Sequence, residues 1–478
     1  MAERKREKAR SRRLKPGRTR LSAPPLARWR ASSESAEAEP ATARATRSPL
    51  PEGTLSVGAG LLVNGLTTYI FLSVARRALT EESYTPLGVL WAVVFLIGPG
   101  FFLPIEQEVS RALADRRARG FGGAPVVRRA LILAAGLLGA LLVLAAVTSS
   151  LLVEHLFDEQ ALLLAGLALS ICGQAAGHLA RGVCSGQARF RPYAVFLGGD
   201  GIFRLLGALV LVIVGVETAG WFGLALGIAP ILAVTVAMSR QRGLLSPGPE
   251  APWRELTTAL AALLAGSILS FTLVNGGPIA VQLLATETEK AEAGRFLNGL
   301  IVARVPLFLF QAVQAALLPR LSALAGAGRL DDFRVGLRRL VLVTVGIAAA
   351  ATAGGFALGP PIVQRVFDEE LALSHRTLGL LALASGLYMI ALALAQAVIA
   401  LGGHRLVAAA WASGVAAFVV GTAFFADELL LRVELGLVAG SALSVVAMAI
   451  ALASRLRGGS QLESGAVIEA LHDIALEP

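Results

Sequence analysis

Charged side chains inside long apolar stretches are the first candidates for chemistry in this sequence. Arg304 stands in the apolar stretch 295–318 with no acidic residue within one helical turn. A charge in such a stretch is costly and usually marks a substrate or ion path. Arginine carries a planar, permanently charged fork that suits phosphate groups. We therefore expect Arg304 to bind an anion, and the alternative is a carboxylate partner on another helix.

Arg204 and Asp200 form a second candidate, in the apolar stretch 193–215. Four residues apart on one helix, they share a face and can neutralise each other. The alternative is that Arg204 faces a lumen together with Arg304. Asp200 would then be a carboxylate able to couple the protein to an ion.

Glu106 and Glu108 stand at the end of the apolar stretch 86–108. As buried carboxylates they are candidates for binding a proton or a cation. The competing interpretation is a pair of interfacial carboxylates, with Glu108 reaching Arg111 three residues further on.

The composition indicates which elements must position these residues. The chain is 55% hydrophobic and 16% charged, whereas soluble domains carry about 25% charged residues. The apolar stretches are about 20 residues long, as a membrane-spanning helix requires, and a β-barrel would instead show short alternating segments. The sequence predicts an all-α polytopic membrane protein with about twelve transmembrane helices. Their expected ranges are 56–75, 86–108, 130–153, 161–181, 193–215, 219–239, 256–285, 295–318, 340–362, 376–398, 405–425 and 434–454.

A long-range repeat indicates that the two halves are built alike. Arg128-Arg129 and Phe157-Asp158-Glu159 recur as Arg338-Arg339 and Phe367-Asp368-Glu369, each 210 residues later (128 to 338 and 157 to 367). Six helices per half give a parallel repeat, an architecture of alternating-access transporters. We expect two six-helix bundles, 56–240 and 256–457, joined by a cytoplasmic linker at 241–255 and flanked by tails at 1–55 and 458–478.

Pro99 and Pro306 occupy corresponding positions in the second and eighth predicted helices. Proline kinks a spanning helix and frees a backbone carbonyl. The pair therefore predicts hinges that bend during a rocking motion; alternatively, the prolines only shape the packing.

Basic residues gather in every second loop between the predicted helices, which we call the basic connections. Such loops usually lie on the cytoplasmic side. The pattern therefore predicts a multi-pass protein of the cell membrane with both termini in the cytoplasm. Arg76 and Arg77 are the exception. Residues 1–50 hold 14 Lys and Arg against 5 Asp and Glu, so this tail is expected to be disordered. It is either a tether to anionic lipid, a solvated tail or an extension from a wrongly assigned start. The basic connections are 111–129, 181–191, 240–254 and 320–339, followed by Arg405, Arg455 and Arg457.

Enzyme signatures are missing from the sequence. The five histidines are scattered, no phosphate-binding loop of the Walker type appears, and the two cysteines have no metal-ligand spacing. No long loop offers room for a catalytic domain. We expect neither enzymatic activity nor a cofactor, and no nucleic acid as partner.

The segments Arg304–Gln311 (RVPLFLFQ) and Leu318–Ser322 (LPRLS), with the paired prolines and the repeat, resemble a known family. Over residues 56–457 the chain is similar to the polysaccharide-flippase branch of the multidrug/oligosaccharidyl-lipid/polysaccharide exporter superfamily. The resemblance implies a V-shaped cavity between two lobes. It also implies flipping of an undecaprenyl-pyrophosphate-linked sugar, coupled to H⁺ or Na⁺.

The resemblance assigns roles to particular residues. Arg304 and Arg204 would hold the pyrophosphate, and Asn64, Asn275 and Gln311 would lie on the cavity wall. Glu106, Glu108 and Asp200 would be the ion-coupling groups. The expected partners are the lipid-linked glycan, membrane lipid, and a polysaccharide polymerase or a glycosyltransferase.

Two other functions stay open. A drug exporter of the same superfamily typically has an acidic residue in its first or seventh helix, but residues 56–75 and 256–285 contain none. A membrane scaffold that recruits proteins through its basic tail would need no cavity.

Overall fold

The computed structural model describes residues 54–257, 260–286, 289–307, 310, 324, 329–367 and 373–474, and it is all-helical across them. This confirms the predicted all-α polytopic fold. The long helices are α1 (Thr54–Ala78), α2 (Glu81–Ala118), α3 (Ala124–Val147), α5 (Ala161–Gly186), α6 (Phe190–Val214), α7 (Ala219–Met238), α9 (Leu260–Leu284), α10 (Lys290–Ala303), α12 (Leu330–Phe367), α13 (His375–Ala400), α14 (His404–Phe424) and α15 (Leu429–Ile474). Three short elements are α4 (Ser149–Leu151), the π-helix η2 (Leu152–Leu156) and α8 (Arg254–Thr257).

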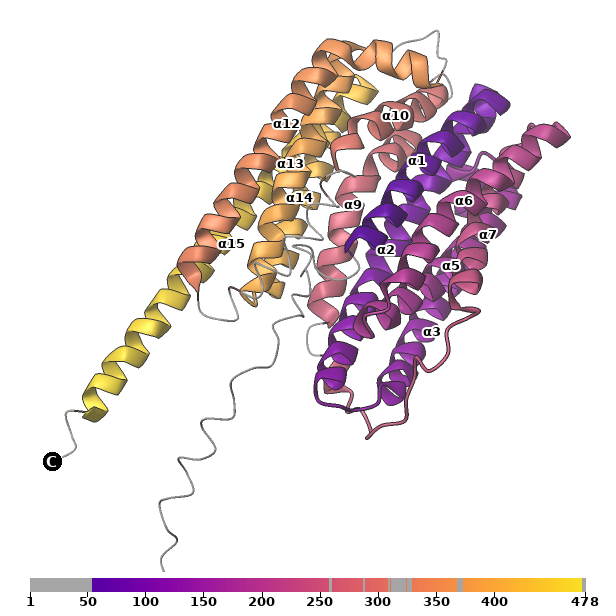
Figure 1. Cartoon of the computed structure of the whole chain (residues 1–478). Helices are drawn as coiled ribbons and strands as arrows, with labels where there is room; N and C mark the ends of the chain where they lie inside the picture. Colours follow the sequence, from indigo (N-terminus) through magenta and orange to yellow (C-terminus); the bar gives the residue numbers. More distant parts are fainter. Residues whose placement is uncertain are drawn as a thin grey trace, which may run out of the picture. The chain divides into compact units, whose positions relative to one another are not determined.

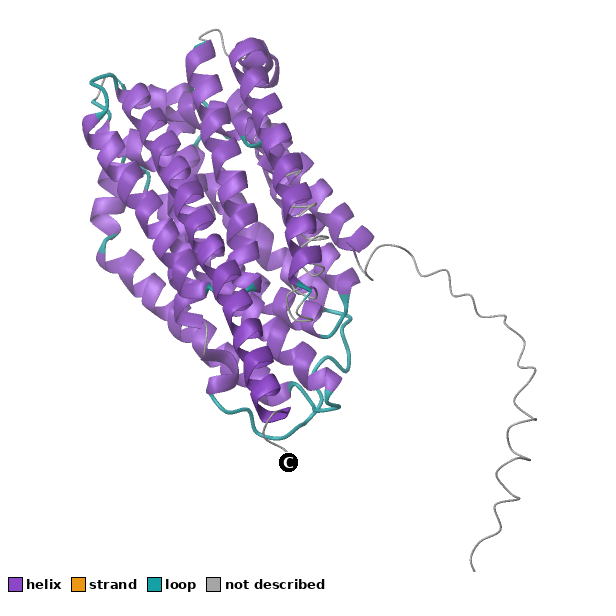
Figure 2. Cartoon of the chain, turned by 90° about the vertical axis from the view of Figure 1, so that its left-hand side faces the viewer, coloured by secondary structure: helices purple, strands orange, loops and turns teal. Residues whose placement is uncertain are grey.

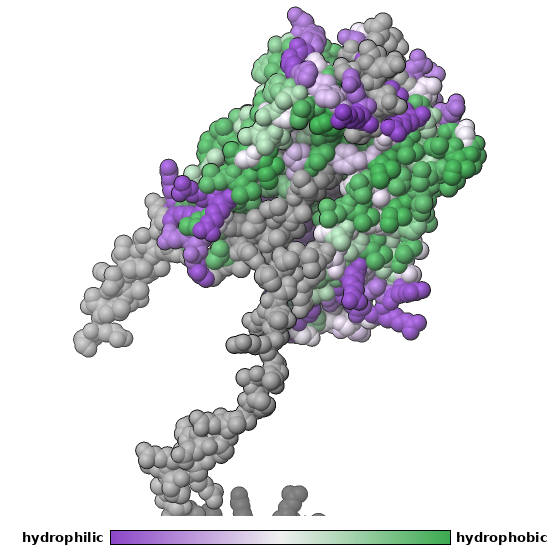
Figure 3. All heavy atoms as spheres, turned by 45° about the horizontal axis from the view of Figure 1, so that its top comes forward, coloured by the Kyte–Doolittle hydropathy of each residue, from purple (hydrophilic) through white to green (hydrophobic). Residues whose placement is uncertain are grey.

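Eleven helices of the described part are long and apolar enough to cross a membrane, and they match eleven of the twelve predicted stretches. The remaining stretch, 295–318, lies partly outside the described residues, and α10 covers its beginning. Many large apolar side chains of these helices are exposed, including Val147, Ile213 and Phe424. Figure 3 shows hydrophobic residues covering the flank, with hydrophilic ones gathered toward the ends. Such a surface is suited to lipid.

The helices pack into two groups with two large apolar cores; the core of the first group extends into the second through residues such as Leu297 and Ile301 of α10. One group, the N-terminal half, contains α1 to α7; the other, the C-terminal half, contains α9 to α15 (Figure 1). Loops join the helices of the described residues (Figure 2). The two halves meet chiefly where α2 packs against α9 and α10. Any site between the halves must therefore be built around α2.

The segment that joins the halves is fixed to the end of α2 by Arg116. Its Nε and Nη2 donate to the Glu255 carboxylate at 2.6 and 2.9 Å, and its Nη1 donates to the carbonyls of Gly122 and Pro249 at 3.0 and 2.8 Å. The guanidinium is buried and holds this segment against α2 and the beginning of α3.

Within the N-terminal half, α5 and α7 approach each other closely through glycines. A Cβ atom added to Gly166 would lie 2.6 Å from the Gly223 carbonyl oxygen, and one added to Gly227 would lie 2.6 Å from the Gly166 carbonyl oxygen. Small residues let membrane helices pack backbone to backbone, where van der Waals contact supplies the attraction.

We predict that Gly166→Val destabilises the protein by about 1–3 kcal/mol, because the new methyl groups overpack this crossing. The measurement is the unfolding temperature of the full-length protein in detergent. Gly136→Val is the matched control, since Gly136 is exposed on α3 with no other side chain or distant backbone within 4 Å of its added Cβ. Equal unfolding temperatures for the two variants would contradict the close packing of α5 against α7 at Gly166.

Candidate functional site

Pro99 lies inside α2 and cannot donate a hydrogen bond to the carbonyl of Phe95, four residues earlier. Asn275 of α9 supplies the missing donor: its Nδ2 lies 3.2 Å from the Phe95 carbonyl oxygen and 3.2 Å from that of Phe271. A side chain of the C-terminal half therefore donates the hydrogen bond that the Phe95 carbonyl of the N-terminal half lacks because of Pro99.

Pro306 interrupts the eighth helix in a similar way. Regular helix α10 ends at Ala303, three residues before the proline. The carbonyl of Ile301, just ahead of this break, accepts a hydrogen bond at 3.1 Å from the hydroxyl of Tyr69 on α1. Tyr84 of α2 adds a second link to α10 by donating to Asn298 Oδ1 at 2.7 Å. Both prolines predicted as hinges thus lie beside contacts between the halves.

Arg304 lies at this break, half-buried, directly after the last residue of α10. Its Nη1 donates to Asn275 Oδ1 at 3.2 Å. Among the described residues no carboxylate forms an ion pair with it. A guanidinium has five N–H donors, so this one has donors left for an anionic ligand. Asn275 therefore connects Arg304 with the backbone break of α2.

Arg204 is in a different environment, with 1% of the residue exposed. Its Nη2 donates to Asp200 Oδ2 at 3.2 Å and to Asn64 Oδ1 at 2.9 Å. Its guanidinium lies over the ring of Trp91, 5.0 Å from the centroid. Arg204 and Asp200 thus form the neutralising pair that their spacing allowed.

The two arginines approach the same turn of α2 from different halves. The guanidinium of Arg204 lies 6.0 Å from the ring centroid of Phe95, and Asn275, which binds Arg304, donates to the Phe95 carbonyl. The structure thus brings Arg204 together with Asn64 and Arg304 together with Asn275, with Phe95 between the two groups. Gln311, the fifth residue predicted to bind substrate, lies outside the described residues.

Glu106 is buried among three polar side chains that the sequence pattern did not connect with it. It accepts hydrogen bonds from Tyr193 at 2.9 Å and shares one with His178 at 2.8 Å, and it forms an ion pair with Arg181 at 2.9 Å. We expected Arg181 in the basic connection 181–191, and this was wrong, because α5 continues to Gly186. The three-residue spacing of His178 and Arg181 is the only signal of this cluster in the sequence.

Two of the predicted ion-coupling carboxylates, Glu106 and Asp200, are thus buried and each forms an ion pair with an arginine. Glu108 lies elsewhere and pairs with Arg111 at 2.7 Å, as its spacing suggested. The described residues contain no group of acidic, histidine or cysteine side chains arranged to hold a metal ion.

Comparison with known proteins identifies the fold. No family model and no curated protein matches the sequence. An inward-facing multidrug resistance MATE family transporter of the MOP superfamily has a similar structure, with 14% identity, a TM-score of 0.62, and 88% of this chain and 97% of that chain covered. An outward-facing structure of such a transporter is 14% identical, with a TM-score of 0.62, and the match covers 86% of this chain and 96% of that chain. A mutant of a Vibrio cholerae MATE transporter is 15% identical, with a TM-score of 0.61, and the match covers 85% of this chain and 96% of that chain.

The chain therefore has the fold of the MATE transporters. These neighbours are consistent with the superfamily that the sequence resembles. They are MATE transporters, two of them described as multidrug resistance transporters, and do not single out the polysaccharide-flippase branch.

We predict that Arg204→Leu destabilises the protein by about 3–5 kcal/mol, because it leaves the buried Asp200 without its partner. The double variant Asp200→Leu/Arg204→Leu should recover part of this loss, since it removes both charges. Unfolding temperatures in detergent test this. A double variant less stable than Arg204→Leu would argue against a structural pair.

Proposed function

We propose that the protein is an alternating-access membrane transporter that flips a polyprenyl-pyrophosphate-linked oligosaccharide for surface polysaccharide export. The observation that carries the proposal is Arg304, a half-buried arginine between the halves with no carboxylate partner among the described residues. A diphosphate is a suitable ligand for such a group, because guanidinium binds phosphate oxygens with paired, charge-assisted hydrogen bonds.

The contacts of Asn275 suggest how binding leads to motion. A diphosphate that binds the remaining donors of Arg304 would draw the guanidinium toward its own oxygens and away from Asn275 Oδ1. Asn275 then loses the contact that orients it toward the Phe95 carbonyl, and the link between α9 and α2 weakens. In this mechanism Pro99 and Pro306 are the hinges, and the lobes rock about a pseudo-two-fold axis along the membrane normal.

Ion coupling is assigned to the buried carboxylates of the N-terminal half, with Glu106 and Asp200 as the main groups and Glu108 as the third. Protonation of Glu106 would neutralise the partner of Arg181, and protonation of Asp200 would do the same for Arg204. The released arginine favours a different packing of α2, α5 and α6. Either H⁺ or Na⁺ could drive this step, and no other cofactor is needed.

The proposed direction of transport is based on the basic connections, which favour cytoplasmic termini. With that orientation the sugar head would enter from the cytoplasmic leaflet while the polyprenyl chain stays in lipid. A glycosyltransferase would supply this cargo, and a polysaccharide polymerase would use it on the other side.

An ion-coupled multidrug exporter is the second candidate, because the structural neighbours are multidrug transporters. Such a protein would take lipophilic cations. The two halves would then need an unpaired carboxylate where they meet, whereas Glu106 and Asp200 each have an arginine partner.

We predict that vesicles containing the protein translocate lipid-linked oligosaccharide and that Arg304→Ala lowers the rate by about tenfold to a hundredfold. This is the range expected when hydrogen bonds to a charged group are lost. Arg304→Lys should retain an intermediate rate, because it keeps the charge but not the fork.

Arg334→Ala is the control, since Arg334 pairs with Asp331 on an exposed face. An unchanged rate in a folded, inserted Arg304→Ala protein would remove Arg304 from the cargo site. Export of lipophilic cations without any flipping of lipid-linked sugar would favour the second candidate.

A further inference from the structure

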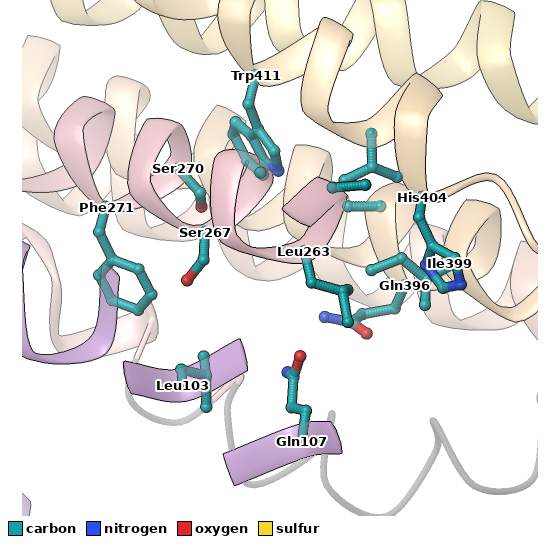
Figure 4. Close-up of a pocket in the computed structure, with 14 residues that line it drawn as sticks. Leu103, Gln107, Leu263, Ser267, Ser270, Phe271, Gln396, Ile399, His404 and Trp411 are labelled. Carbon is teal, nitrogen blue, oxygen red and sulfur yellow. The ribbon is translucent and has the colours of Figure 1, made fainter. Parts of the chain in front are cut away.

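A pocket lies beside the Arg304 site, between α2 of the N-terminal half and α9, α13 and α14 of the C-terminal half. Figure 4 shows the carboxamides of Gln107 and Gln396 pointing toward each other inside it, with Ser267 and Ser270 on the neighbouring face of α9. The proposed function gives this pocket no role.

The pocket wall is largely apolar and carries a few polar side chains. Gln107 and Gln396 contribute amides, Ser267 and Ser270 contribute hydroxyls, and His404 contributes an imidazole. None of the described lining residues is Asp, Glu, Lys or Arg. Amides both donate and accept hydrogen bonds, as sugar hydroxyl and acetamido groups do. Among the described lining residues a diphosphate would find no arginine or lysine, and a lipophilic cation would find no carboxylate.

Aromatic side chains complete the wall. Phe271 and Trp411 both line the pocket, and the ring of Trp411 packs against Tyr388 with 5.2 Å between the centroids. An apolar ring surface beside convergent hydrogen-bonding groups suits a ligand that has both C–H faces and polar edges. A pyranose ring has this character.

Asn275 connects the pocket with Arg304. Phe271 lines the pocket, and its carbonyl accepts a hydrogen bond from Asn275 Nδ2 at 3.2 Å. The Oδ1 atom of Asn275 accepts from Arg304 Nη1, also at 3.2 Å. The pocket and the cationic group are therefore neighbours, in the way that a sugar neighbours the diphosphate to which it is bonded.

We propose that this pocket binds an uncharged sugar unit of the cargo, next to a diphosphate held by Arg304. The inference rests on the proposed function and adds the substrate class of the second subsite. Because Gln107 belongs to one half and Gln396 to the other, a bound sugar contacts both halves.

The test measures ligand protection of the full-length protein in detergent, because a ligand that binds the folded state raises the unfolding temperature. The probes are N-acetylglucosamine, N-acetylgalactosamine, glucose, galactose and mannose, with tetraphenylphosphonium as the lipophilic cation. We expect at least one neutral sugar to protect the wild type. Gln107→Leu and Gln396→Leu should each weaken its apparent affinity by about tenfold, the effect of losing one or two hydrogen bonds.

Gln174→Leu is the matched control, since Gln174 is an amide in a spanning helix outside the pocket. Gln396→Met serves as a second variant if Gln396→Leu does not fold. Absence of protection by every sugar, or equal protection of wild type and pocket variants, would overturn the proposal. Protection by tetraphenylphosphonium that disappears in Gln396→Leu would make the pocket a drug site and overturn it as well.

Failure of this inference can be told apart from failure of the proposed function. If flipping in vesicles continues at the wild-type rate in the double variant Gln107→Leu/Gln396→Leu, the sugar pocket is wrong and the flippase function stands. If sugars protect the protein through Gln396 but no lipid-linked sugar is flipped, the sugar pocket stands and the function is wrong.

Discussion

Lipid offers no hydrogen bonds to a backbone carbonyl, so every proline in a spanning helix creates a group that the protein itself must satisfy. Here the Phe95 carbonyl, which Pro99 leaves without its helical donor, accepts a hydrogen bond from Asn275 of the opposite half. Near the second proline, Tyr69 donates to the Ile301 carbonyl, which also accepts from the Arg304 backbone N–H and lies five residues ahead of Pro306. The contact between the halves is therefore built in part from a group that Pro99 made available.

This arrangement gives the two arginines different tasks. Arg204 has a carboxylate, an amide and an aromatic face as partners within its own half, so its charge is compensated by neighbouring side chains. Arg304 has an amide that is already engaged with α2. In the proposed mechanism an anion draws Arg304 away from this amide and so weakens a contact between the halves, which links ligand binding to conformation through one asparagine.

Local patterns in the sequence were sufficient for the helices and for contacts within one helix. Apolar stretches of spanning length located the helices, and the spacings of Asp200 with Arg204 and of Glu108 with Arg111 anticipated their pairing. Contacts between helices were not predictable, because no periodicity records which faces meet. The partners of Glu106 and the convergence of Gln107 with Gln396 depend on such contacts. The cargo is not a property of the fold either, since it depends on a few side chains between the halves.

The central claim is that Asn275 transmits the state of Arg304 to the contact between the halves. The most direct measurement is the distance between two spin labels, attached at Ala118→Cys and Arg405→Cys in nanodiscs. Ala118 and Arg405 are exposed, at the end of α2 and the beginning of α14. The two native cysteines are removed by Cys172→Ala and Cys184→Ala, so that only these positions are labelled. The account predicts that farnesyl diphosphate shifts the distance distribution of the wild type, and that Asn275→Leu adopts the shifted distribution without ligand. Identical distributions for wild type and Asn275→Leu, with and without farnesyl diphosphate, would contradict it.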